Sequence, residues 1–197
     1  MEIQLLNYLP LYIFIALMVS TPGPANLLFM SAGLNHGFKA TLPFLAANIA
    51  GMVAINMGMA IGLGSLIREN VMLANTLTII SVCYMVYLSL GSWNSNQGAQ
   101  EVSRRALSFK KGLLVQPLSP KSWMMVTLAY SQFSGLFSSS MEMYVVIVGF
   151  FALCQLLFHS SWSMAGVLLQ RSLGGSLWLN RSLILLTIAV VLWAALQ

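Results

Sequence analysis

The sequence predicts an all-α membrane protein with six transmembrane helices, built as two inverted three-helix repeats whose first helices, the first and fourth spans, are broken. Of its 197 residues, 58% are hydrophobic and only 7% are charged, whereas a soluble domain carries about 25% charged residues. Its uncharged apolar stretches reach the length of about 20 residues that a bilayer-spanning helix needs. Lipid offers the backbone no hydrogen-bond partners, so such stretches are expected to be helical. Soluble, disordered and disulfide-scaffold classes are therefore excluded.

The charged residues mark where the spans end. We expect one transmembrane domain, 1–197, with spans at 5–34, 41–67, 71–93, 112–136, 143–169 and 177–196. The hydrophilic linker 94–111 separates a first three-span repeat, 1–93, from a second, 112–197. Because three is an odd number, the second repeat enters the membrane in the opposite orientation. That layout is typical of secondary transporters.

The basic residues predict the orientation in the membrane. With the linker 94–111 in the cytoplasm, the external loops carry a single basic residue, Arg68. The cytoplasmic loops then carry Lys39, Arg104, Arg105, Lys110, Lys111, Arg171 and Arg181. Such an excess on the cytoplasmic side follows the positive-inside rule, so we expect both termini outside. These charges lie between apolar runs and form no basic face, which favours membrane lipid over nucleic acid as a partner.

The first span is interrupted in its middle by Thr21-Pro22-Gly23-Pro24, followed by Asn26. Proline removes a backbone donor and clashes with the preceding turn, and glycine relaxes the backbone. We therefore expect the helix to stop and restart here. Thr21 is placed to cap the helix that resumes after Pro22.

The fourth span is interrupted in the same way. Its break reads Gln116-Pro117-Leu118-Ser119-Pro120-Lys121, with Ser119 as the candidate cap. Lys121 is the one charge that no loop accommodates. A charge inside the membrane is expensive and usually functional, although a lysine that snorkels to the cytoplasmic face is the alternative.

Both breaks are predicted to lie near the membrane midplane. Pro24 is 12 residues from His36, and Pro120 is 9 residues from Lys111. At the helical rise these are roughly 13–18 Å from the cytoplasmic face, in a hydrocarbon core of about 30 Å. Paired breaks in corresponding spans indicate a transport site. Each restarting helix presents free N–H groups, which attract an anionic group such as a carboxylate.

Other polar residues inside the spans are candidates for the same site. No span contains an acidic residue, so a substrate ammonium would meet exposed carbonyls or Asn26, Asn48 and Gln116. Asn48 could equally bond a neighbouring helix. His159 follows Gln155 by four residues and could relay protons, because histidine titrates near neutral pH; a bond to a neighbouring helix is the alternative. The chain has only two histidines, and its two cysteines lie far apart in the sequence and form no CxxC motif. We therefore expect no metal or other cofactor.

These motifs together resemble the LysE/RhtB family of amino-acid exporters. The resemblance covers nearly the whole chain and departs from it at Ser119, where the family usually has asparagine, and at Met52, where many members have an acidic residue. The matching residues are Thr21-Pro22-Gly23-Pro24, Asn26, Ser31, Gly33, Asn35-His36-Gly37-Phe38, Phe109-x-x-Gly112, Ser119-Pro120-Lys121 and the stretch 84–93.

The resemblance implies a secondary active exporter of amino acids or close derivatives in the bacterial inner membrane, and not an enzyme. One half would rock against the other to give alternating access. A non-transporting scaffold subunit and a small-solute channel are the alternatives, and Gly58-x-x-x-Gly62 leaves a homo-oligomer open. The expected substrate-binding residues are Thr21, Pro22, Gly23, Pro24, Asn26, Asn48, Gln116, Ser119, Pro120 and Lys121.

Overall fold

The computed structural model describes residues 7–62, 69–91, 93, 108–173 and 177–195. Within these ranges it contains eight α-helices, one short 3₁₀ helix and no strand, which confirms the all-α class. The helices are α2 (Leu9–Ser20), α3 (Pro24–His36), α4 (Phe38–Ala60), α6 (Val71–Leu90), α8 (Phe109–Val115), α9 (Pro120–Phe133), η1 (Ser134–Leu136), α10 (Ser140–Leu173) and α11 (Leu177–Ala195). Most of the predicted linker 94–111, and the predicted end of the second span, lie outside the described residues.

The predicted spans are confirmed in part. The helices α4, α6 and α10 are each long and apolar enough to cross a membrane, and α2 with α3 forms a fourth candidate bent by 54°. The helix α11 is a shorter apolar helix, and α8 with α9 adds no candidate crossing among the described residues. Large apolar side chains face outward, including Met72 at 80% and Trp178 at 82% exposure. By length and composition, the described residues therefore hold three helices that could cross a membrane, or four if the bent pair is one span.

Both helix breaks occur where the prolines predict them. The first separates α2 from α3, which starts at Pro24, and the second separates α8 from α9, which starts at Pro120. Proline fits the first position of a helix because the N–H group it lacks has no helical partner there, and its φ angle is already helical. The prediction of two interrupted helices is therefore confirmed.

The two restarting helices are capped differently. Thr21 was expected to cap the first, and this is wrong: the cap position of α3 is Gly23, without a side-chain bond, and Thr21 Oγ1 donates to the Met18 carbonyl at 3.0 Å. The helix cannot restart at Thr21 because Gly23 is still extended. Ser119 does cap α9, since its Oγ accepts the N–H of Ser122 at 3.4 Å.

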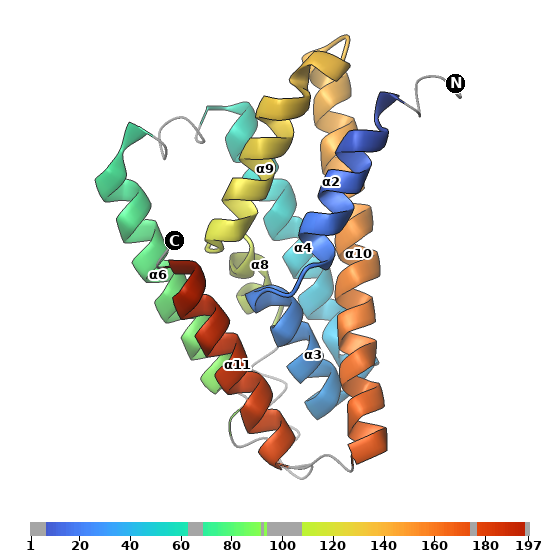
Figure 1. Cartoon of the computed structure of the whole chain (residues 1–197), viewed down its shortest axis with the longest axis vertical. Helices are drawn as coiled ribbons and strands as arrows, with labels where there is room; N and C mark the ends of the chain where they lie inside the picture. The colour runs from blue at the N-terminus through green and yellow to red at the C-terminus, as the bar shows by residue number, and fades with distance from the viewer. Residues whose placement is uncertain (1–6, 63–68, 92, 94–107, 174–176, 196–197) are drawn as a thin grey trace.

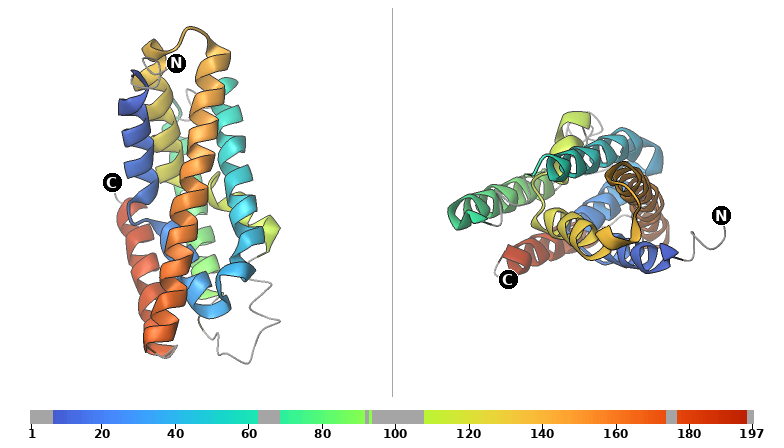
Figure 2. Two further views of the ribbon diagram at one scale, coloured as in Figure 1. Left: turned by 90° about the vertical axis from the view of Figure 1, so that its right-hand side faces the viewer. Right: turned by 90° about the horizontal axis from the view of Figure 1, so that it is seen from above.

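The breaks divide the bundle into two ends. Figure 1 shows α10 running its full height, with α2 and α9 in the upper half and α3 and α11 in the lower half. Viewed from the side and from above, α4 and α10 lie close to one another beside the broken helices (Figure 2). At 1.5 Å per residue the 34 residues of α10 span about 51 Å, so this helix is longer than the bilayer core is thick.

Two apolar clusters fill these two ends. The α2–α9 cluster joins α2, α4, α9 and α10, and the α3–α11 cluster joins α3, α4, α6, α8 and α11. The α2–α9 cluster consists of Leu11, Ile15, Val19, Met52, Ile55, Met125, Val126, Ala129, Ile147, Phe151 and Cys154. The α3–α11 cluster consists of Leu28, Phe29, Phe44, Leu45, Met85, Leu88, Val115 and Val191. Met52, where many members of the family that the sequence resembles have an acidic residue, is thus part of an apolar core.

Glycines allow two pairs of helices to approach closely. An added Cβ would lie 1.9 Å from the Ser163 carbonyl oxygen at Gly33, and 2.0 Å from the Met30 carbonyl oxygen at Gly166. These two glycines therefore let α3 and α10 touch through their backbones. Gly51 of α4 packs in the same way on the backbone of α8, where an added Cβ would lie 2.4 Å from the Leu113 carbonyl oxygen. This face of the second predicted span thus packs inside the bundle.

A polar contact links the two halves of the chain at the end of the bundle near Tyr8. The Tyr8 hydroxyl donates to Glu142 Oε1 at 2.6 Å, and the Ser138 N–H donates to Oε2 at 2.9 Å. The Tyr8 ring also stacks on Phe137, with centroids 5.0 Å apart. Because both hydrogen bonds favour the charged carboxylate, they hold the pKa of Glu142, which precedes the predicted fifth span, below its ordinary value.

Candidate functional site

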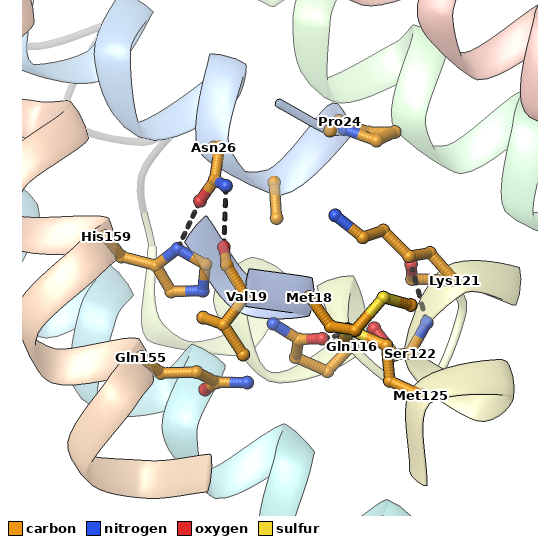
Figure 3. A pocket seen from close by; sticks show the side chains of 13 residues that line it. Met18, Val19, Pro24, Asn26, Gln116, Lys121, Ser122, Met125, Gln155 and His159 are labelled. Atoms are coloured by element: carbon orange, nitrogen blue, oxygen red, sulfur yellow. Dashed lines mark hydrogen bonds between the residues drawn. The ribbon is translucent and has the colours of Figure 1, made fainter. Parts of the chain in front are cut away.

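A small cavity lies where the two helix breaks meet, and Figure 3 shows the side chains that line it. Its volume of about 20 Å³ is enough for a water molecule. An amino acid would need the walls to move apart. The cavity is lined by Met18, Val19, Gly23, Pro24, Ala25, Asn26, Gln116, Ser119, Lys121, Ser122, Met125, Gln155 and His159.

Lys121 joins the two breaks to one another. It is the second residue of α9, where it follows Pro120, and its Nζ donates to Thr21 Oγ1 at 2.8 Å and to the Thr21 carbonyl oxygen at 3.3 Å. Gly23 leaves room for the lysine, since an added Cβ there would lie 3.2 Å from Nζ. An ammonium group has three donors, so one N–H group remains for a ligand.

Asn26 and His159 form a buried polar pair across α3 and α10. The Asn26 Nδ2 donates to the carbonyl oxygens of Val19 at 2.9 Å and Thr21 at 2.8 Å, which uses both of its hydrogens. Its Oδ1 lies 2.7 Å from His159 Nδ1. The His159 ring stacks on Phe29, with centroids 4.6 Å apart. Asn26 thus ties the carbonyls freed by the first break to the histidine.

A second polar network stabilises the other break. Gln116 Nε2 donates to Asn48 Oδ1 at 2.7 Å. The Ser122 hydroxyl donates to Gln116 Oε1. Gln116 is 2% exposed and Asn48 is fully buried, so this network links α4, the second break and α9 without contact with solvent.

The predicted site residues divide into two groups. Those that line the cavity are Gly23, Pro24, Asn26, Gln116, Ser119, Lys121 and His159, and those that do not are Thr21, Pro22, Asn48 and Pro120. Thr21 and Pro22 are exposed on the outside of the break. Thr21 nevertheless bonds Lys121, and Asn48 lies behind Gln116.

Gln155, which is not among the predicted site residues, lines the cavity one turn before His159 on α10. Met18, Val19, Ala25, Ser122 and Met125 also line it without having been named. The spacing of Gln155 and His159 was the available signal, because residues four apart share one face of a helix.

The cavity lining has one charge, the positive charge of Lys121, and no carboxylate. The described residues contain no group of three or more His, Cys, Asp or Glu side chains that could hold a metal ion. The arrangement can therefore bind an anionic group beside Lys121 and uncharged hydrogen-bonding groups elsewhere. Nothing in the lining has the geometry of a nucleophile with its base.

The sequence matches one protein-family model and several curated proteins. The family model described as LysE type translocator matches residues 15–195. The homoserine/homoserine lactone efflux proteins of Salmonella typhimurium and Salmonella typhi are each 24% identical to the chain over 119 residues. That match covers 57% of this chain and 57% of each relative, so the chain spans little more than half the length of these curated relatives. No solved structure matches the chain.

Proposed function

Because the chain belongs to the LysE type translocator family, a family of transporters rather than enzymes, we propose that it is a secondary active exporter of amino acids or close derivatives across the bacterial inner membrane. The relatives are named for the efflux of homoserine and its lactone, which are a small amino acid and its cyclic ester. Export of small amino acids of this kind is the function that the cavity supports best.

The observation that carries the proposal is the meeting of both helix breaks at one cavity through Lys121. The lysine keeps one N–H group beyond its two bonds to Thr21, and its Nζ lies close to Gly23, the cap residue of α3, which contributes no side-chain bond. A helix N-terminus carries a partial positive charge that favours anions. A substrate carboxylate between Lys121 and the start of α3 would receive charge-assisted hydrogen bonds.

Transport proceeds by alternating access around this cavity. The chain would cross the membrane six times as two inverted three-span repeats, with the linker 94–111 in the cytoplasm and both termini outside. The two apolar clusters, which pack different sets of helices, would act as the two gates. With a volume of about 20 Å³, the cavity would have to widen at each step before a substrate could enter or leave.

Efflux from cells tests the proposal directly. Bacteria that overproduce the protein would be loaded with dipeptides, which release amino acids inside, and the amino acids that appear in the medium would be measured. We expect faster export of at least one small neutral amino acid, and loss of this gain in Lys121→Ala at equal membrane abundance. Lys110→Ala, which removes an exposed lysine at the start of α8, is the matched control and should export normally.

Three results would contradict the proposal. Unchanged efflux of every amino acid would remove amino acids as the substrate class. Equal efflux by wild type and Lys121→Ala would remove the lysine from the site. Rapid equilibration of many unrelated solutes would indicate a channel.

A further inference from the structure

Two residues that line the cavity have, between them, three buried polar atoms without a hydrogen-bond partner among the described residues. They are both amide atoms of Gln155, Nε2 and Oε1, and the Nε2 atom of His159. Gln155 is fully buried and His159 is 3% exposed. A buried polar group without a partner destabilises a protein, so folded proteins rarely keep one without a reason. Figure 3 shows both residues on the side of the cavity opposite Lys121.

The neighbouring hydrogen bonds determine what His159 can offer. Asn26 donates both of its amide hydrogens to the carbonyls of Val19 and Thr21, so the atom that faces His159 is the amide oxygen. An amide oxygen only accepts hydrogen bonds, and His159 Nδ1 must therefore donate. In the neutral ring the proton is then on Nδ1, and Nε2 presents a lone pair to the cavity.

Four other acceptors at the helix breaks already receive a hydrogen bond. The Asn26 oxygen is bonded to His159, the Gln116 oxygen accepts from Ser122, and the Val19 and Thr21 carbonyls accept from Asn26. The expectation that Asn26, Asn48 and Gln116 bind the substrate ammonium is therefore not supported by the geometry. The unpartnered acceptors are Gln155 Oε1 and His159 Nε2, which lie one turn apart on α10.

We propose that Gln155 and His159 together form the subsite for the ammonium group of the substrate, opposite the carboxylate position at Lys121. This inference rests on the proposed export of amino acids and specifies the substrate class. The ammonium donates to Gln155 Oε1 and to His159 Nε2, and no carboxylate is needed. Lys121 is the one charged residue of the lining. A zwitterionic amino acid is neutral overall, so its binding leaves the net charge of the cavity unchanged. A lysine or arginine substrate would add a second positive charge without a partner, so the protein selects neutral amino acids.

The test compares a substrate with the same molecule lacking its amino group. Purified protein in liposomes would be assayed for counterflow of labelled L-homoserine, with unlabelled L-homoserine, 4-hydroxybutyrate and L-lysine as competitors. Wild type should prefer L-homoserine over 4-hydroxybutyrate by about 10- to 100-fold, which corresponds to hydrogen bonds to a charged group. L-Lysine should compete at least tenfold more weakly than L-homoserine.

Gln155→Met should abolish most of this preference. Methionine keeps the length of glutamine and removes its amide, so the KM for L-homoserine should rise about tenfold or more, while inhibition by 4-hydroxybutyrate stays unchanged. Gln132→Met makes the same substitution at an exposed position of α9 and should behave like wild type. Unchanged inhibition by 4-hydroxybutyrate also shows that the variant is folded.

The outcomes separate the two proposals. If wild type shows counterflow of amino acids and Gln155→Met keeps the wild-type KM and preference, the ammonium subsite is wrong and the exporter stands. Strong competition by L-lysine would also overturn the subsite. If wild type shows no counterflow with any amino acid, the proposed function itself fails.

Discussion

Close packing of α3 on α10 is tested most sharply by Gly166→Ala. The added Cβ would lie 2.0 Å from the Met30 carbonyl oxygen and 2.8 Å from the Leu34 nitrogen, both backbone atoms. Neither atom can turn away as a flexible side chain could. The helices must therefore separate by roughly 1 Å to restore normal contact distances, and this movement also loosens the contact between Asn26 and His159.

The size of the effect follows from the cost of overpacking. Extra methyl groups in a packed interior cost about 1–3 kcal/mol, and 1 kcal/mol changes the Tm of a chain of this length by about 2–4 °C. We expect Gly166→Ala to lower the Tm by about 2–12 °C. Gly149→Ala is the matched control on the same helix, because an added Cβ there meets no atom within 4 Å. Its better helix propensity should leave the Tm unchanged or raise it slightly.

Thermal unfolding of both purified variants in detergent, followed by circular dichroism, measures the difference. A Tm for Gly166→Ala equal to that of Gly149→Ala would refute the reasoning, because it would mean that α3 and α10 are not in backbone contact. A loss of stability for both variants alike would refute it too, since it would point to a general intolerance of α10 to substitution.

Three further predictions follow from the cavity and from the Tyr8 contact. Gln155→Met should raise the Tm by about 2–12 °C, because it removes a buried unpartnered amide that costs about 1–3 kcal/mol; an unchanged or lower Tm would mean that the amide has partners. Gly23→Ala should lower the export rate at unchanged membrane abundance, because its Cβ would displace Lys121 Nζ, 3.2 Å away; wild-type export would contradict this. Tyr8→Phe should lower the Tm at neutral pH, where Glu142 is charged, and the difference from wild type should disappear as the pH falls below about 4.3 and then through the lowered pKa of Glu142. A difference in Tm that is constant between pH 7 and pH 3 would show that the hydrogen bond to the carboxylate is not its source.

Helix breaks could be predicted from the sequence because proline acts locally. Pro24 and Pro120 each open a helix in the structure, as their missing N–H group requires. The cap of α3 was predicted wrongly, since the side chain of Thr21 bonds back to Met18 and forward to Lys121. That second contact joins residues 100 positions apart, and no local pattern contains it.

The residues that line the cavity could be predicted only in part, because several of them are brought there by contacts between distant parts of the chain. A charged residue in an apolar span signals a function by its cost, so Lys121 was found. Gln155 carries no charge, and its spacing from His159 shows only that both share a face of a helix; its role depends on atoms of other helices that leave its amide without a partner. In the same way, the assignment of Asn26 and Gln116 to substrate could be revised only once their bonding partners were known.

Counterflow in proteoliposomes tests the central claim most directly, namely that a substrate carboxylate binds beside Lys121 between the two breaks. Labelled L-homoserine would be taken up by liposomes preloaded with unlabelled L-homoserine, with wild type, Lys121→Met and the exposed-lysine control Lys110→Met. We expect transient accumulation of label for wild type and for Lys110→Met, and a loss of at least tenfold in the rate for Lys121→Met, because a charge-assisted bond is removed. Accumulation by Lys121→Met at the wild-type rate would contradict it.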